Sequence, residues 1–361
     1  MLEKFINYPQ LEITSGEKIN KFFREIKNQY SVNALKEKLN DFKDLKILLI
    51  GDTIIDRYDY VIPKGRAIKD PILSCDFLSS EIYAGGILAI ANHLSDFVDE
   101  IKLLTLIGDI DDNLDFIKDN IKPNVELEYF RKKNAYTTLK RRFINKQRNE
   151  KLFKVEKMSD FPISHELTDT IIKRILNIIN KYDIVMVGDF GHGFINDKII
   201  SILEEKSKFL AVNVQTNSAN LGFNYVTKYS TADFVSLDYR ELQYAVQDQY
   251  GKQDVLLEKL RKQVDFRNIL VTMGKKGVLY SNNSGNYFSP AFKTTVKDTI
   301  GAGDTVFSIA SLLAYKKYEG NLLNFYSSCS GALAVQFMGN QMSLNKADLN
   351  KFIETILTNG D

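Results

Sequence analysis

The chain is poor in the residues that build disulfide networks and metal centres. Its 361 residues include two cysteines, Cys75 and Cys329, and three histidines. The cysteines form no Cys-x-x-Cys pair, and the histidines show no spacing typical of metal ligands. The composition therefore argues against a secreted disulfide scaffold and against a small zinc module.

The chain also lacks a strong net charge and long apolar runs. The 48 basic and 46 acidic residues nearly cancel, so the overall charge favours neither nucleic acid nor an acidic membrane as a partner. No apolar run reaches the roughly 18 residues of a membrane span, and the first residues lack the apolar core of a signal peptide. We therefore expect a cytoplasmic protein that acts on a small molecule.

Apolar runs that end in Gly, Asp or Asn alternate with amphipathic segments along most of the chain. This alternation is typical of an α/β protein, in which crossover helices connect the strands of a parallel sheet. We predict strands at 46–50, 101–107, 184–187, 209–212, 234–236, 269–272 and 277–281 and helices at 164–180, 197–206, 254–262 and 303–316.

Three stretches depart from the alternation. Residues 58–83 and 129–155 are rich in β-formers and charge, and we expect them to form a small second sheet that folds over the site as a lid. Residues 1–45 combine charged side chains with spaced apolar positions, which predicts a helical extension of unknown role. The main domain would then span residues 46–361.

The most informative segment is Asp298-Thr299-Ile300-Gly301-Ala302-Gly303-Asp304-Thr305. Its glycines allow a tight turn that exposes backbone N–H groups at the start of a buried helix, where an anion can bind. Asp304, in the first helical turn, can accept a proton from an attacking hydroxyl. The alternative is an acidic helix N-terminus that simply follows a glycine turn.

This D-T-x-G-A-G-D string resembles the signature of the ribokinase-like (PfkB) family of sugar kinases, and the order of motifs from Lys46 onward is also similar to that family. The resemblance implies a three-layer fold, with a central, mostly parallel sheet flanked by helices, plus a small β lid. It implies an ATP-dependent kinase in which Asp304 is the base, Gly301, Ala302 and Gly303 form the anion hole, and Asp298 lies with the cofactor.

Two carboxylates, Asp52 and Asp56, follow the first predicted strand in the string G-D-T-I-I-D-R-Y. Paired acceptors at the end of a strand suit sugar hydroxyls, although Asp residues are also common in turns. The string is similar to the start of the bacterial heptose-7-phosphate kinases, and this resemblance implies that Asp56 contacts the sugar.

Gly85 and Gly86 resemble the glycine pair that opens a helix beside the sugar in this family, and glycine lets the backbone approach a ligand closely. Ala89 and Ile90 stand where the family usually has an Asn, and Asn92 comes later. We expect Asn92 to take part in sugar binding, with a substrate that differs from the usual one.

The segment Thr137-Thr138-Leu139-Lys140-Arg141-Arg142 places Lys140 and Arg142 on one face of a strand. A basic pair on the lid suits a phosphorylated substrate, but it is equally compatible with a solvated lid face. The T-T-x-K-x-R run again resembles the heptose-phosphate kinases, and it favours a sugar phosphate.

Two further elements resemble the parts of the family that handle ATP. Asp238 and Glu241 are similar to the N-x-x-E element and would bind Mg²⁺ directly or through water, unless they are merely a helix capping box. Thr272, Gly274 and Gly277 resemble the turn beside the ATP phosphates, which a plain hairpin explains equally well. The resemblance also allows a monovalent cation.

Two positions depart from the heptose kinases. Asn213-Val214-Gln215 stands where they carry Asp-Pro-Lys, and His192 stands at the lysine of a D-Y-G-K-G segment. An amide run can still bind hydroxyls, but it lacks the positive charge of lysine. We expect His192 to be a surface histidine in a turn.

The hypothesis from sequence is an enzyme that transfers the γ-phosphoryl group of ATP to the anomeric hydroxyl of heptose 7-phosphate, giving heptose 1,7-bisphosphate. The alternatives are a kinase for another sugar or nucleoside, or a kinase-like binding protein without activity. We also expect a homodimer formed through the lid. Because no H-x-G-H motif occurs, a separate nucleotidyltransferase would act downstream.

Overall fold

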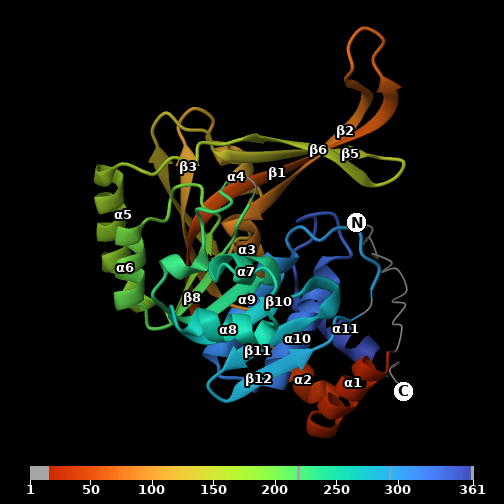
Figure 1. The fold of residues 1–361 in the computed structure, drawn as a ribbon. Coiled ribbons are helices and arrows are strands. Elements are labelled where there is room, and N and C mark those ends of the chain that lie inside the picture. The colour runs from red at the N-terminus through yellow and green to blue at the C-terminus, as the bar shows by residue number, and fades with distance from the viewer. Residues whose placement is uncertain (1–15, 218–219, 293, 359–361) are drawn as a thin grey trace.

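The structure is a computed structural model that describes residues 16–217, 220–292 and 294–358 (Figure 1). Its main sheet has the strand order β12-β11-β10-β9-β8-β7-β1-β3-β4, parallel from β10 to β4 and antiparallel at β11 and β12. The strands are β1 (Lys46–Arg66), β3 (Glu100–Gly108), β4 (Val125–Lys132), β7 (Ile184–Asp189), β8 (Leu210–Val214), β9 (Thr231–Asp238), β10 (Asp265–Thr272), β11 (Val278–Asn282) and β12 (Gly285–Ser289).

Helices cover both faces of this sheet. One face packs against α5 (His165–Ile178), α6 (Asp197–Lys206), α7 (Tyr239–Ala245) and α8 (Gln253–Arg261). The other packs against α3 (Ile87–Leu94), α9 (Ala302–Tyr315), α10 (Gly320–Ala334) and α11 (Lys346–Thr358). Each face has its own hydrophobic cluster, so the predicted three-layer α/β architecture is confirmed.

The lid grows directly out of the main sheet. β1 continues beyond the sheet and pairs there with β2 (Leu73–Gly86) and β5 (Thr138–Asn145), and β5 pairs with β6 (Glu150–Lys157). The hairpin of β1 and β2 projects from the body, at the upper right in Figure 1. β1 therefore belongs to both sheets and fixes the lid relative to the core.

The predicted strands and helices all appear, and most of their ends differ by a few residues. The first strand, predicted at 46–50, is much longer and continues as β1 to Arg66. One boundary of the lid also differs. Residues 129–132, which the sequence placed in the lid, belong to β4 and pair with β3 at the edge of the main sheet. Of these residues, Tyr129 and Phe130 are half-buried, Arg131 is exposed and Lys132 is buried.

Within residues 16–45 the predicted N-terminal extension is helical and packs into the main core, whereas its residues 1–15 lie outside the described part of the chain. α1 (Glu17–Gln29) buries Phe22, Phe23 and Ile26, and the ring of Phe23 meets Phe292 edge-on at 4.9 Å between centroids. α2 (Val32–Lys38) buries Leu35, whose carbonyl accepts a hydrogen bond from Tyr326 on α10. Both helices lie at the lower right in Figure 1, and α2 packs against α11. The segment thus shares the hydrophobic cluster of the kinase part.

A short helix, α4 (Leu114–Asp119), lies between β3 and β4 in the chain. Among the described residues, the search for a helix that combines enough length with enough apolar character to cross a bilayer finds no candidate.

We expect Phe23→Ala to lower the free energy of unfolding by about 3–5 kcal/mol, because it removes a fully buried ring from the core. Arg24→Ala on the exposed side of the same helix is the matched control and should change it by less than about 0.5 kcal/mol. Chemical denaturation measures both. Equal stability of the two variants would show that α1 is a detachable appendage.

Candidate active site

Polar residues gather where the strands of the main sheet end at their carboxyl side. Asp189 ends β7, Gln215 follows β8, and Asp238 ends β9. β1 passes through the same edge and continues into the lid. Ligands of open α/β sheets bind at this edge. The start of α9 also lies there, because Asp304 in its first turn contacts Gln215.

Helix α9 begins with a turn in which the N–H of Ala302 donates to the carbonyl of Thr299 at 3.4 Å, whereas the N–H groups of Gly303 and Asp304 have no acceptor among the described residues. Gly301, the N-cap, has a left-handed backbone with φ of 81°, and no side chain caps the helix. A Cβ on Gly301 would lie 2.2 Å from Oδ1 of Asn340, whereas a Cβ on Gly303 would meet open space. The first turn therefore presents free donors, and the positive end of the helix dipole, to an open volume suited to an anion.

Asp304 lies in this first turn and is 6% exposed. Burial, together with the nearby negative charge of Asp56, raises the pKa of its carboxyl to about 7, against the opposing effects of Gln215 and Lys140. Oδ1 of Asp304 accepts a hydrogen bond of 2.6 Å from Nε2 of Gln215. A carboxylate with a pKa near neutrality is well suited to act as a general base.

Asp56 faces the same space from β1. It forms an ion pair with Arg142 of β5, and its Oδ2 accepts a hydrogen bond of 3.3 Å from Nδ2 of Asn340. Gly85 on β2 permits this arrangement, because a Cβ there would lie 2.3 Å from Oδ2 of Asp56. The predicted sugar ligand Asp56 is thus buried and held by Arg142 and Asn340.

Lys140 and Arg142 share one face of β5, as the alternation predicted, but their surroundings differ. Arg142 is occupied by Asp56 and lies over the ring of Tyr58. Lys140 is 8% exposed and has no carboxylate of the described residues within ion-pair distance. Burial lowers the pKa of its ammonium group. Lys140 alone, rather than Lys140 and Arg142 together, is therefore in a position to bind an anion.

Gly86 is the N-cap of α3, with φ of 57°, so the glycine pair does open a helix. Asn92, farther along α3, has both ends of its amide occupied: Nδ2 donates to the carbonyl of Asn120 and Oδ1 accepts from the backbone of Lys122. Asn92 also lines a cavity of about 240 Å³ that reaches Asn340. In this structure its amide anchors the loop before β4.

His93, the next residue of α3, links three segments. Its Nδ1 accepts a hydrogen bond from the backbone of Leu344, so the neutral ring carries its proton on Nε2, 3.1 Å from Oγ1 of Thr305. Thr305 donates in turn to the carbonyl of Gly301. This relay fixes the backbone of the turn before α9.

Asp298 is buried and surrounded by protein donors. Its Oδ2 accepts from the hydroxyl of Tyr58 and from the backbone of Gly339, and its Oδ1 accepts from the backbone of Thr299. It also forms an ion pair with Lys151 on β6. Asp298 therefore ties the glycine turn to the lid, and its predicted contact with the cofactor stays a prediction.

Asp238 and Glu241 form a capping box at the start of α7. Each oxygen of Glu241 accepts from a backbone N–H, one from Asp238 at 2.7 Å and one from Thr216 at 3.0 Å. Burial raises the pKa of Glu241 to about 7. The described residues contain no cluster of three acidic, histidine or cysteine side chains that could hold a metal. The contact of Asp238 and Glu241 with Mg²⁺, directly or through water, stays a prediction.

Thr272, Gly274 and Gly277 connect the antiparallel strands β10 and β11. Gly277 has φ of 111°, and a Cβ there would lie 2.0 Å from the carbonyl of Ser289, so packing alone requires glycine. Gly274 has φ of 53° and open space around it. The hairpin is confirmed, while contact of its residues with ATP stays a prediction.

The expectation of a surface histidine at position 192 is wrong. His192 is 5% exposed, and burial lowers its pKa to about 3. Both ring nitrogens lack a partner among the described residues. It lines a small cavity of about 20 Å³ with Asp52, Lys132 and Thr138, a volume that suits one water molecule. The lid covers this turn, which periodicity along one chain segment cannot reveal.

Three residues of the site were not selected from the sequence: Gln215, Asn340 and His93. Gln215 was noticed as a departure from the heptose kinases, but its contact with Asp304 joins residues 89 positions apart. Asn340 lies in a loop without any recognisable pattern, and His93 is hidden inside an apolar helix. Long-range contacts of this kind leave no local signal.

A model of the pfkB family of carbohydrate kinases matches residues 44–344 of the chain. The chain belongs to this family. As a pfkB carbohydrate kinase it is a phosphotransferase whose acceptor is an alcohol group. All the residues of the site described above lie within the matched range.

Curated relatives of this pfkB kinase include proteins called bifunctional protein HldE. The chain is 27% identical over 289 residues to that of Shewanella baltica (strain OS155), covering 78% of this chain and 58% of the relative. It is 24% identical over 277 residues to that of Campylobacter jejuni, covering 76% and 57%. The chain thus spans somewhat more than half of the length of these relatives.

Solved structures support the fold of the pfkB kinase. Phosphofructokinase-2 from Escherichia coli in complex with potassium has a TM-score of 0.69 at 14% identity, covering 87% of this chain and 99% of that one. Arabidopsis thaliana ribokinase complexed with ribose and ATP has a TM-score of 0.66 at 15% identity, covering 86% and 99%.

We expect acid to destabilise the kinase through His93. Burial lowers its pKa from 6.5 to about 4, so the unfolded chain takes up the proton first and stability falls as the pH drops below 6.5. The loss between pH 7 and pH 5 should be about 2 kcal/mol. His93→Gln should lose less over this range, as measured by denaturation at each pH. The exposed His165→Gln is the control, and a His93→Gln variant with the wild-type slope would contradict the assignment.

Proposed function

We propose that the kinase transfers the γ-phosphoryl group of ATP to the anomeric hydroxyl of a sugar phosphate, with heptose 7-phosphate as the best candidate. Asp304 takes the hydroxyl proton. The hydroxyl oxygen then bonds to the γ-phosphorus, the bond from that phosphorus to the bridging oxygen breaks, and ADP leaves. The N–H groups at the start of α9 stabilise the charge on the transferred group.

The observation that carries this proposal is the position of Asp304. A buried carboxylate with a pKa of about 7 lies in the first turn of an uncapped helix, beside the open volume at Gly303. A protein that only binds sugars has no need of such a base. Asp56, held by Arg142 and Asn340, supplies the acceptor that a sugar hydroxyl needs.

A phosphorylated acceptor is supported by Lys140. A buried ammonium group without a paired carboxylate costs free energy, and an anionic substrate would offset that cost. The motifs of β1 and β5 resemble the heptose-7-phosphate kinases, and the relatives named HldE point in the same direction. The pairing of Arg142 with Asp56 favours the alternative, a neutral sugar or nucleoside, because it removes one of the two expected phosphate ligands.

A homodimer formed through the lid is also part of the proposal. Large apolar side chains are exposed on the lid strands, among them Phe77 at 59%, Phe153 at 49% and Val155 at 51%. Exposed apolar side chains that gather on one element often mark a protein interface. A second copy of the lid would cover them.

Asp304→Asn should reduce kcat by about 10²–10⁴-fold while ATP still binds, because the amide keeps the size of the side chain but cannot accept the proton. Steady-state kinetics with a panel of sugars and sugar phosphates gives the rate, and calorimetry gives ATP binding. An Asn variant that turns over at the wild-type rate would exclude Asp304 as the base.

Lys140→Met should raise KM for the phosphorylated sugar about ten- to a hundredfold, since one charge-assisted contact contributes about 1.5–3 kcal/mol. KM for ATP should change little. Arg142→Ala is less diagnostic, because it leaves Asp56 unpaired and so disturbs the binding of every sugar.

Lys64→Met, on the exposed part of the lid, is the matched control for the loss of one charge. A wild-type enzyme that prefers a neutral sugar to its phosphate, together with an unchanged KM in Lys140→Met, would reject the sugar-phosphate assignment. The kinase would then act on an uncharged sugar or nucleoside.

A further inference from the structure

We propose that Gln215 is a positioning residue for the base: its side-chain amide holds Oδ1 of Asp304, so that Oδ2 is the atom that receives the proton of the substrate hydroxyl. This inference rests on the proposed function, because it takes Asp304 as the base. In this arrangement Gln215 acts through Asp304. Oδ1 of Asp304 accepts the hydrogen bond from Gln215, and Oδ2 accepts the proton of the substrate.

The amide of Gln215 can adopt one orientation only. Its Nε2 donates to Oδ1 of Asp304 at 2.6 Å and to Oδ1 of Asn213 at 3.2 Å. Asn213 is itself fixed, because its Nδ2 donates to the carbonyl of Ser236 at 2.9 Å. A flipped amide would place its oxygen against two acceptors, which is unfavourable. The donor is therefore aimed at Asp304 before any substrate arrives.

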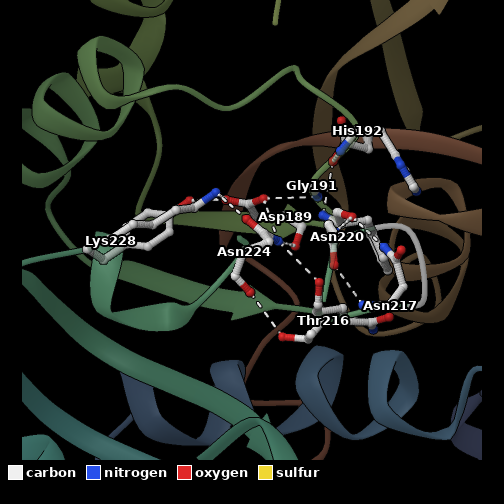
Figure 2. A network of polar contacts seen from close by, with 12 residues as sticks. Asp189, Gly191, His192, Thr216, Asn217, Asn220, Asn224 and Lys228 are labelled. Carbon is white, nitrogen blue, oxygen red and sulfur yellow. Dashed lines mark hydrogen bonds and ion pairs between the residues drawn. The ribbon is translucent and has the colours of Figure 1, made fainter. Parts of the chain in front are cut away.

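The backbone of Gln215 is also held at both polar atoms. Its N–H donates to the carbonyl of Asp189 at 2.9 Å, and its carbonyl accepts from Nδ2 of Asn224 at 3.1 Å. Figure 2 shows the network around Asp189, to which the loop after β8 is tied. The buried carboxylate of Asp189 pairs with Lys228 at 2.5 Å, and Asn220 donates to the carbonyl of Phe190 at 2.9 Å.

This network gives Gln215 a rigid support. Thr216, the next residue, donates its hydroxyl to the carbonyl of Asn224 (Figure 2). Its N–H donates to Glu241. Gly191 is required for the same packing, because a Cβ there would lie 2.2 Å from Nδ2 of Asn220. A donor whose backbone and side chain are both fixed loses little entropy when it orients a catalytic group.

The charges around Asp304 make the role of Gln215 measurable. Asp56 on β1 and Glu241 on α7 are negative neighbours, Lys140 on β5 is positive, and Gln215 is the neutral donor. Arg142 partly compensates Asp56 through their ion pair. Because the hydrogen bond from Gln215 favours the ionised carboxyl, its loss raises the pKa of Asp304. A negative charge at position 215 raises it further.

The test is the pH dependence of kcat for Gln215→Met and Gln215→Glu. In the wild type, kcat should rise with pH through the pKa of Asp304, since the ionised form is the base. In Gln215→Glu this rise should move to higher pH by about one unit. In Gln215→Met it should move in the same direction by less, and the plateau at high pH should fall roughly tenfold because Asp304 is no longer oriented. KM for ATP should stay within about twofold of wild type.

Gln249→Glu, in an exposed loop, is the control with the same change of charge, and its profile should match the wild type. A merely structural role of Gln215 would lower the amount of active enzyme without moving the rise in kcat, and that result overturns the inference. Asp304→Asn separates the two proposals. If Asp304→Asn is inactive at every pH while the Gln215 variants keep the wild-type pH profile, the inference about Gln215 is wrong, and Asp304 remains the proposed base. If it keeps the wild-type rate, the proposed base itself is wrong.

Discussion

The buried carboxylate of Asp304 is the constraint on which the rest of the site depends. A negative charge in a poorly hydrated place costs free energy, and here the first turn of α9, Lys140 and Gln215 offset part of that cost. The part of this cost that is not offset keeps the pKa of Asp304 near neutrality, where a general base is most effective. The relay from His93 through Thr305 to Gly301 serves the same carboxylate by fixing the turn before it.

Most of the fold could be predicted from the sequence because its signals are local. Apolar runs ended by Gly or Asp mark β1, β3, β7, β8 and β10, and amphipathic periodicity marks α5, α6, α8 and α9. The glycine turn before α9 was also readable, since Gly301 needs a left-handed backbone. The family match over residues 44–344 agrees with this assignment.

The connections within the site could not be predicted, because they join distant segments. The sequence shows that Lys140 and Arg142 share a face, but it does not show that Arg142 is neutralised by Asp56. It marks Gln215 as a departure from the heptose kinases without revealing its contact with Asp304. The sequence indicates a turn at His192, but it does not show that the side chain is buried. Charge and burial at such positions follow from the tertiary fold.

The continuity of β1 has a mechanical consequence for the lid. Its ladder with β2 and β5 is regular from Ile54 to Asp59, next to the site, while both register shifts with β2 occur later, at Tyr60/Val61 and Pro63/Gly65. A regular ladder with strands on both sides resists bending, whereas bulges are points of compliance. The part of the lid next to Asp56 is therefore rigid, because it is paired on both sides and continues from a strand of the core sheet. The outer hairpin is the compliant end, free to adapt its shape without disturbing Asp56.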